Sequence, residues 1–168
     1  MTSVPAWTER PRDEASLFNP AFLGAVLAQA ADGHRKDSGV GLPWSLGFIA
    51  LPAVLHKETR EALPRSISTS MAAWTRDHAL LVGSLPQRAR LLQPRVSEAV
   101  LFGLAHGFLV HEDGRLLPGQ RRKRAPTDPW REPTDDFRQC ASKAALFGRW
   151  CARSGLPATI YALWGARP

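Results

Sequence analysis

Five histidines are the side chains of this sequence that could bind a metal or move a proton. Metal sites usually show short repeated spacings, such as Cys-x-x-Cys or two histidines one helical turn apart. No such spacing relates the five histidines, which are His34, His56, His78, His106 and His111. We therefore expect each to be a polar side chain at a helix end or on a strand, and we predict no metal and no cofactor.

Two cysteines, Cys140 and Cys151, could form a disulfide or provide a nucleophile. If both lie on one helix, about 16 Å of helix axis separates them, whereas a disulfide needs Cα atoms within about 7 Å of each other. We therefore expect reduced thiols, as is usual in the cytoplasm. On an apolar helix face they would pack as small hydrophobic side chains.

Motifs for phosphate binding and for nucleophilic catalysis are missing. Gly39 and Gly41 lie in a polar loop at residues 34–43, but no strand precedes them and no Gly-Lys-Ser/Thr follows. The serines at 66, 68 and 70 lie in no nucleophile elbow. The sequence has no Walker lysine, so it predicts a protein that does not bind ATP by a P-loop. These observations together predict a protein that is not an enzyme.

Basic charge is the most concentrated polar feature of the chain. The formal net charge is +7, the sequence pI is about 10.4, and the excess lies in the middle third. Arg121, Arg122, Lys123 and Arg124 follow one another in a proline-rich loop at 119–133. Four such cations could bind phosphates in a salt-dependent, sequence-independent way. A solvated loop and contact with an acidic protein surface are the alternatives.

Local signals predict short, sharply bounded helices. Asn19 is a good N-cap and Pro20 suits the first helical position, while Phe18 can pack on Leu23 as a hydrophobic staple. We expect a helix at 20–32 that stops at Gly33. A buried helix kinked at Pro52 should follow at 44–55, and another helix at 66–78. Further helix starts are expected at two prolines, Pro86 and Pro94.

A hairpin is predicted where Asp113-Gly114 separates two apolar runs, because a type I′ turn needs positive φ at both central residues. This register pairs Glu112 with Arg115 across the first rung. Short helical units leading into a hairpin are the order of a winged helix, although any small α+β domain could show it. In the winged reading, Arg115 and the basic loop would contact DNA.

The C-terminal part should contain a helix that begins near Thr134 and stops at Gly155. Residues 159–164 have strand composition and would serve as a third strand beside the hairpin. The expected fold is mainly α with a small antiparallel β-hairpin or sheet, in a single domain at 1–168. Its parts are an extended arm (1–16), a helical part (17–105), a hairpin wing (106–118), the basic loop (119–133) and a helix plus strand (134–168).

Exposed aromatic residues are candidates for partner binding. Trp7 and Trp130 lie in polar, proline-rich segments, where a tryptophan suits an interface. Phe18 and Phe22, at the start of the first helix, join them as predicted partner-binding residues. Core packing is the expectation for the other four tryptophans, which are Trp44, Trp74, Trp150 and Trp164.

The N-terminal half resembles a known family. The run Glu9-Arg10-Pro11, the stretch Leu17–Phe22 (LFNPAF) and Gly39-x-Gly41-x-Pro43 precede the stretch Leu51–Arg60 (LPAVLHKETR). Together they resemble the middle components of bacterial three-component ABC systems, most clearly over about residues 9–70. The resemblance implies a Rad50- or SMC-like ABC ATPase as one partner and an effector, often a nuclease, as the other. Such systems act against phages or plasmids, and the Lamassu systems are of this kind.

We therefore expect a non-enzymatic adaptor that links the ATPase to the effector, with the wing and basic loop near DNA. The alternative is a free-standing winged-helix DNA-binding regulator, which would bind a short operator on its own. The first sixteen residues lack the apolar core of a signal peptide, and the longest apolar run, at 46–55, is too short to span a bilayer. A cytoplasmic protein without membrane contact is expected.

Overall fold

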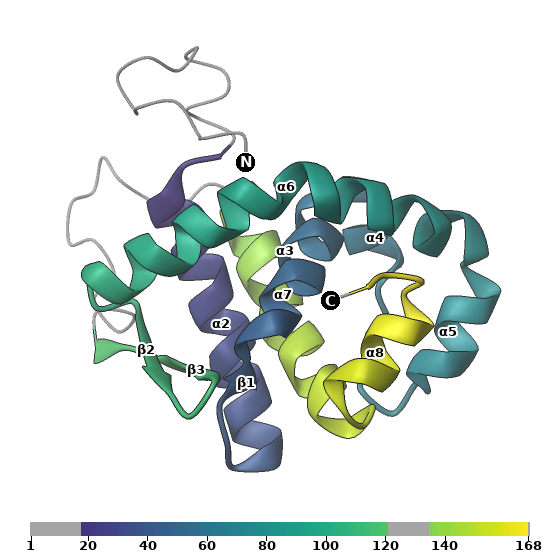
Figure 1. Cartoon of the computed structure of the whole chain (residues 1–168). Coiled ribbons are helices and arrows are strands. Elements are labelled where there is room, and N and C mark those ends of the chain that lie inside the picture. The colour runs from purple at the N-terminus through teal and green to yellow at the C-terminus, as the bar shows by residue number, and fades with distance from the viewer. Residues whose placement is uncertain (1–17, 121–134, 168) are drawn as a thin grey trace.

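The computed structural model describes residues 18–120 and 135–167 (Figure 1). Helices predominate among them and the strands form one antiparallel sheet, so the predicted fold class is confirmed. The predicted arm at 1–16 and almost all of the basic loop lie outside the described residues. In chain order the elements are α2 (Pro20–Ser38), β1 (Leu42–Pro43), the 3₁₀ helix η2 (Trp44–Leu46), α3 (Gly47–Leu55), α4 (Lys57–Ala62), α5 (Met71–Asp77), α6 (Ala79–Ala105), β2 (Leu109–Glu112), β3 (Arg115–Pro118), α7 (Asp135–Arg153) and α8 (Pro157–Leu163).

Helix α2 begins where the sequence predicts and ends later. The Ala21 backbone N–H donates a hydrogen bond of 2.9 Å to the Asn19 side chain, so the predicted cap is confirmed. The predicted stop at Gly33 is wrong, because the helix continues to Ser38. Gly39 ends it in the left-handed conformation, with a φ of 79°, which glycine adopts without steric cost.

Gly33 is needed instead where α2 crosses α7. A Cβ added at Gly33 would lie 2.0 Å from the Ala145 carbonyl oxygen, and one added at Gly148 would lie 1.9 Å from the Ala30 carbonyl oxygen. Real Cβ atoms essentially never approach another atom within 3.0 Å. The two glycines therefore let the backbones of α2 and α7 touch.

Helix α3 is buried on nearly all sides, as its almost continuous apolar sequence predicts. Ile49, Leu51 and Val54 are fully enclosed, and Pro52 lies inside the helix. His56 follows α3 and caps α4, since its Nδ1 atom accepts a hydrogen bond of 3.3 Å from the Thr59 backbone N–H. The chain thus passes from a buried helix to a charged one at a single residue.

Three tryptophans from separate segments meet in the core. The ring centroids of Trp74, Trp150 and Trp164 lie 5.4 to 6.5 Å apart, and each side chain is almost fully buried, so core packing is confirmed for them. For Trp44 that prediction is wrong, because its side chain is 49% exposed, although its ring meets the Phe48 ring edge-to-face. Trp44 lies where the chain turns from β1 into α3, at the surface.

Helix α6 runs unbroken through the two prolines that were expected to start separate helices. Proline removes one backbone donor and crowds the carbonyl one turn before it. Near Pro86, the carbonyl oxygen of Leu81 accepts a hydrogen bond of 3.1 Å from Arg88 Nη2. Pro86 leaves the Val82 carbonyl without its usual backbone donor, and packing on α2 and α3 keeps the helix continuous.

The expected helix at 66–78 is shorter than predicted, because α5 begins only at Met71. Ser70 provides the cap, and its hydroxyl accepts a hydrogen bond of 3.4 Å from the Ala73 backbone N–H. The short helical units predicted before the hairpin are therefore one short helix and one long one.

The hairpin has the predicted turn and register. Asp113 and Gly114 have φ values of 48° and 73°, and Glu112 pairs with Arg115 across the first rung. A main-chain hydrogen bond of 3.1 Å from the Trp44 N–H to the Gly114 carbonyl ties η2 to the turn.

The third strand of the sheet is not the one predicted. The strand order is β1-β3-β2, so Leu42 and Pro43 pair with β3, and residues 159–164 belong mainly to helix α8. Ile160, Tyr161 and Trp164 are the buried side chains there, a helical spacing that packs one face on the core. Burial on that face overrides the strand propensity of the individual residues.

Candidate partner-binding groove

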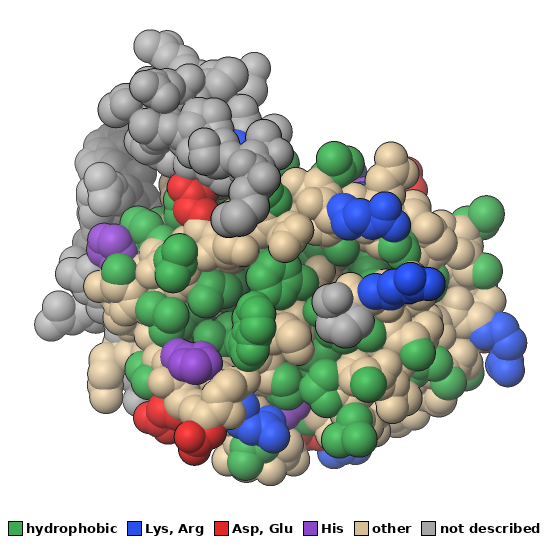
Figure 2. All heavy atoms as spheres, viewed as in Figure 1, with side chains coloured by type: hydrophobic (Ala, Val, Ile, Leu, Met, Phe, Trp, Pro, Cys, Tyr) green, Lys and Arg blue, Asp and Glu red, His purple; other side chains and the backbone are tan. Residues whose placement is uncertain are grey.

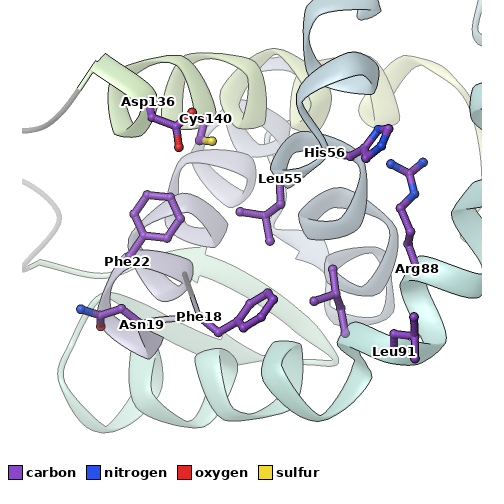
Figure 3. A pocket seen from close by; sticks show the side chains of 10 residues that line it. Phe18, Asn19, Phe22, Leu55, His56, Arg88, Leu91, Asp136 and Cys140 are labelled. Carbon is purple, nitrogen blue, oxygen red and sulfur yellow. The ribbon is translucent and has the colours of Figure 1, made fainter. Parts of the chain in front are cut away.

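A surface groove of about 650 Å³ lies where four helices meet (Figure 3). The start of α2, the end of α3, the middle of α6 and the start of α7 form its walls. Most of the lining is apolar, and polar groups sit at the rim. The lining residues are Phe18, Asn19, Phe22, Leu55, His56, Arg88, Leu91, Leu92, Asp136 and Cys140.

The aromatic wall is held in place by contacts with neighbouring helices. Phe22 meets the Phe137 ring edge-to-face at 5.6 Å between centroids, and the Arg95 guanidinium lies 5.9 Å from the centre of the Phe18 ring. Both groove phenylalanines remain partly exposed. On the opposite wall Leu91 is 72% exposed, so hydrophobic surface on both walls is open to a ligand.

A buried arginine ties the floor of the groove together. Arg60 is 4% exposed, and its Nη1 atom donates to the carbonyl oxygens of Val54 at 2.9 Å and Leu55 at 3.3 Å. Its Nη2 atom pairs with Asp136 at 2.6 Å. The arginine therefore connects the C-terminal end of α3 to the N-terminal end of α7.

Arg88 is the second cation of the groove, and it has no such partner. It donates to the Thr59 hydroxyl and to the Leu81 carbonyl, both at 3.1 Å, and its Nε atom is buried with no hydrogen-bond partner. Among the residues that the structure describes, no carboxylate forms an ion pair with Arg88. Burial lowers the pKa of Arg88, and the negative charge of Glu58 partly opposes this lowering.

His56 shares Thr59 with Arg88. Its Nδ1 atom lies 2.9 Å from the Thr59 hydroxyl. Burial, and then the charge of Arg88, lower the pKa of His56, so the imidazole is neutral at neutral pH. Of the described residues that line this end of the groove, Arg88 is therefore the charged one, and Glu58 lies near enough to oppose part of the lowering of the pKa of both Arg88 and His56.

Among the described lining residues, Cys140 is the one whose side chain could act as a thiol nucleophile. Cys140 is buried, its Sγ lies 3.7 Å from the Val54 carbonyl oxygen, and burial raises the pKa of its thiol, so the thiolate nucleophile is disfavoured. Within the described ranges, no cluster of histidine, cysteine and acidic residues could hold a metal ion. The geometry is that of a binding surface with apolar walls and a charged rim.

Comparison with known families now identifies the chain. The family described as ABC-three component (ABC-3C) system Middle Component 3 matches residues 7–168. The chain belongs to this family. The resemblance seen in the N-terminal stretches is thus confirmed, and the match extends over nearly the whole chain. No curated protein and no solved structure matches it.

Two of the residues predicted to bind partners are brought together in this ABC-3C middle component. Phe18 and Phe22 both line the groove (Figure 3), while Trp7 and Trp130 lie outside the described residues. Sequence analysis missed Arg88 and Leu91, because Pro86 and Pro94 were expected to interrupt the helix that carries them. No sequence signal indicated them, because the exposure of Leu91 and the helices that face it are set only by the folded chain.

The residues predicted to bind DNA are not gathered into one site within the described residues. Arg115 donates to the Gly41 carbonyl oxygen at 3.0 Å and so fastens β1 beside β3. Arg121, Arg122, Lys123 and Arg124 lie outside the described ranges. On the face drawn in Figure 2, the visible Lys and Arg side chains form no continuous patch, whereas hydrophobic side chains gather over the left half.

In the part of the chain that the structure describes, no helix has the length and apolar character needed to cross a bilayer.

Proposed function

We propose that this ABC-3C middle component is a non-enzymatic adaptor. It links an SMC- or Rad50-like ABC ATPase to an effector subunit, such as a nuclease, in a cytoplasmic complex that acts against phages or plasmids. The observation that carries the proposal is an open apolar groove in a chain whose family is defined by membership of a three-component system. Hydrophobic side chains exposed on both groove walls are typical of a surface that a partner covers.

Co-purification tests the adaptor role directly. The chain is co-expressed with the ABC ATPase and the third component of its own system, and a tag on either of these should recover all three. Omitting the middle component should separate the other two. The adaptor role is contradicted if the ATPase and the effector are recovered together in the absence of this chain. It is also contradicted if neither the ATPase nor the effector is recovered with this chain.

Leu91 should be a binding residue, and Leu101 gives a matched control. Both lie on α6 and are 72% and 68% exposed, but only Leu91 lines the groove. Because an arginine at position 91 would place charge against an apolar partner, Leu91→Arg should weaken complex formation about 10-fold or more. Leu101→Arg should bind as the parent does. Affinities are measured by titration of the purified subunits, and equal effects of the two substitutions would contradict a role for the groove.

Contact with DNA is a second, separable part of the proposal. The wing residue Arg115 and the four cations Arg121, Arg122, Lys123 and Arg124 are its candidate phosphate contacts. Replacing the four consecutive cations with serine should weaken DNA association and reduce the slope of log affinity against log salt by up to about 3.6. Arg115 is left unchanged because it also holds β1. Fluorescence anisotropy with random duplex DNA measures the slope, and an unchanged slope indicates a loop that is only solvated.

A preference of the isolated chain for one short operator over random DNA would instead favour a free-standing regulator.

A further inference from the structure

The groove walls restrict the backbone form of whatever binds there. Every described lining residue lies in a helix or next to a helix end, where backbone N–H and C=O groups are largely used within the helix. An extended peptide would find no strand edge to pair with in this groove, and its own backbone groups would lose water without replacement. A helix satisfies its backbone internally, so it can place apolar side chains between these walls without that cost.

Charge fixes a second property of the ligand. Asp136 already neutralises Arg60 at one end of the groove, so an acidic group placed there would gain no net attraction from this pair. Among the residues that the structure describes, Arg88 donates to neutral acceptors only, the Thr59 hydroxyl and the Leu81 carbonyl. Figure 3 shows Asp136 and Arg88 on opposite sides of Leu55, so the two ends of the groove differ in charge.

We propose that the groove binds an amphipathic helix of another subunit of the complex, with a carboxylate beside its apolar face that pairs with Arg88. This inference rests on the proposed adaptor function and adds the chemistry of the partner segment. Apolar side chains of that helix, one turn apart, pack between Phe22 and Leu91. The carboxylate is held at the Arg88 end, because a cation in an apolar wall binds an anion more strongly than a solvated one does. The helix is thereby fixed in one direction along the groove.

Photo-crosslinking in the full complex identifies the segment. p-Benzoylphenylalanine replaces Leu91 in one sample and Leu101 in the control, and crosslinked peptides are identified by mass spectrometry. We expect position 91 to capture a peptide of another subunit with apolar residues at i, i+3 or i+4 and i+7, and with an aspartate or glutamate on the same side. Capture of residues from this chain, whether its own N-terminal residues or a second copy, overturns the inference.

Charge reversal then tests the pairing. Arg88→Glu should weaken the complex at least about 10-fold, and reversal of the captured carboxylate to lysine should restore the affinity. Arg88→Gln keeps a donor for Thr59 and removes the charge, so it serves as the second variant if the glutamate disturbs folding. Thermal unfolding of each isolated variant is measured alongside.

The outcomes separate the two levels of the proposal. One outcome is that Leu91→Arg weakens the complex while both Arg88 variants fold as the parent does and bind normally. In that case the proposed pairing of Arg88 with a partner carboxylate is wrong and the adaptor role stands. If no complex forms with the unaltered chain, the adaptor role itself fails. Rescue by the lysine partner supports the paired carboxylate, because a purely structural role of Arg88 would not respond to a change on the partner.

Discussion

Gly148→Ala should destabilise the protein by about 3 kcal/mol, because one methyl group cannot be placed between α7 and α2. The new Cβ would lie 1.9 Å from the Ala30 carbonyl oxygen and 3.0 Å from the His34 backbone nitrogen. Both are main-chain atoms, which cannot rotate away as a side chain can. The helices would have to separate, and their shared apolar contacts would loosen. Urea unfolding followed by circular dichroism measures the loss.

Gly83→Ala is the matched control for this prediction. Gly83 also lies inside a helix, α6, but an added Cβ there meets nothing within 4 Å. Alanine restricts the unfolded chain more than glycine does, so this substitution should stabilise the protein by about 0.5–1 kcal/mol. Opposite signs for the two substitutions would establish that the close helix crossing, and not helix propensity, decides the result. Equal effects would contradict it.

Arg60→Met should cost about 3 kcal/mol, since it removes the donor that joins α3 to α7 beneath the groove. The methionine can fill much of the space of the arginine stem, but the Val54 carbonyl loses its 2.9 Å side-chain hydrogen bond in a buried place. Asp136 is 68% exposed and can turn to water, so most of the cost falls on the buried carbonyl. Equilibrium unfolding in urea measures the change in free energy.

Arg76→Met provides the control on an exposed ion pair. Arg76 and Asp77 are 78% and 63% exposed and lie 3.4 Å apart. Exposed pairs contribute little, so this change should stay within about 0.5 kcal/mol of the parent. If Arg60→Met is as mild as Arg76→Met, the buried network is not a structural link.

The hydrogen bonds of Arg60 also affect the groove as a binding site. Arg60 holds Asp136 at one end of the groove and the last turn of α3 at its floor. The groove is therefore formed by helix ends that are fastened to one another before any partner arrives. A preformed site avoids part of the ordering cost of association, which suits the proposed adaptor role.

Local signals determined those elements whose geometry depends on neighbours in the sequence. The cap at Asn19 places the start of α2 because the side chain bonds a backbone N–H only two residues away. Asp113 and Gly114 place the hairpin because both adopt positive φ in a two-residue turn, and the register follows from the turn. The helix that carries both cysteines was likewise predicted from local signals. Both cysteines are buried in it as free thiols.

Only the tertiary structure decided the elements whose stability depends on distant contacts. Gly33 is a helix stop by composition, yet α7 packs against it and α2 continues. Residues 159–164 favour a strand individually, but their buried side chains fit the core as a helix. Pro86 and Pro94 are helix starts by local rule and lie inside α6, where packing on α2 and α3 keeps the helix continuous.

The groove residues also divide into those that the sequence predicts and those that only the tertiary structure places. By itself the sequence determined the fold class, the family resemblance and two of the aromatic residues, Phe18 and Phe22, because these rest on local patterns. It could not place Leu91 and Arg88 opposite them, since sequence distance says nothing of which helices meet. That neighbourhood exists only after α2, α3, α6 and α7 pack; among the described residues, no carboxylate then pairs with Arg88, and Leu91 stays exposed.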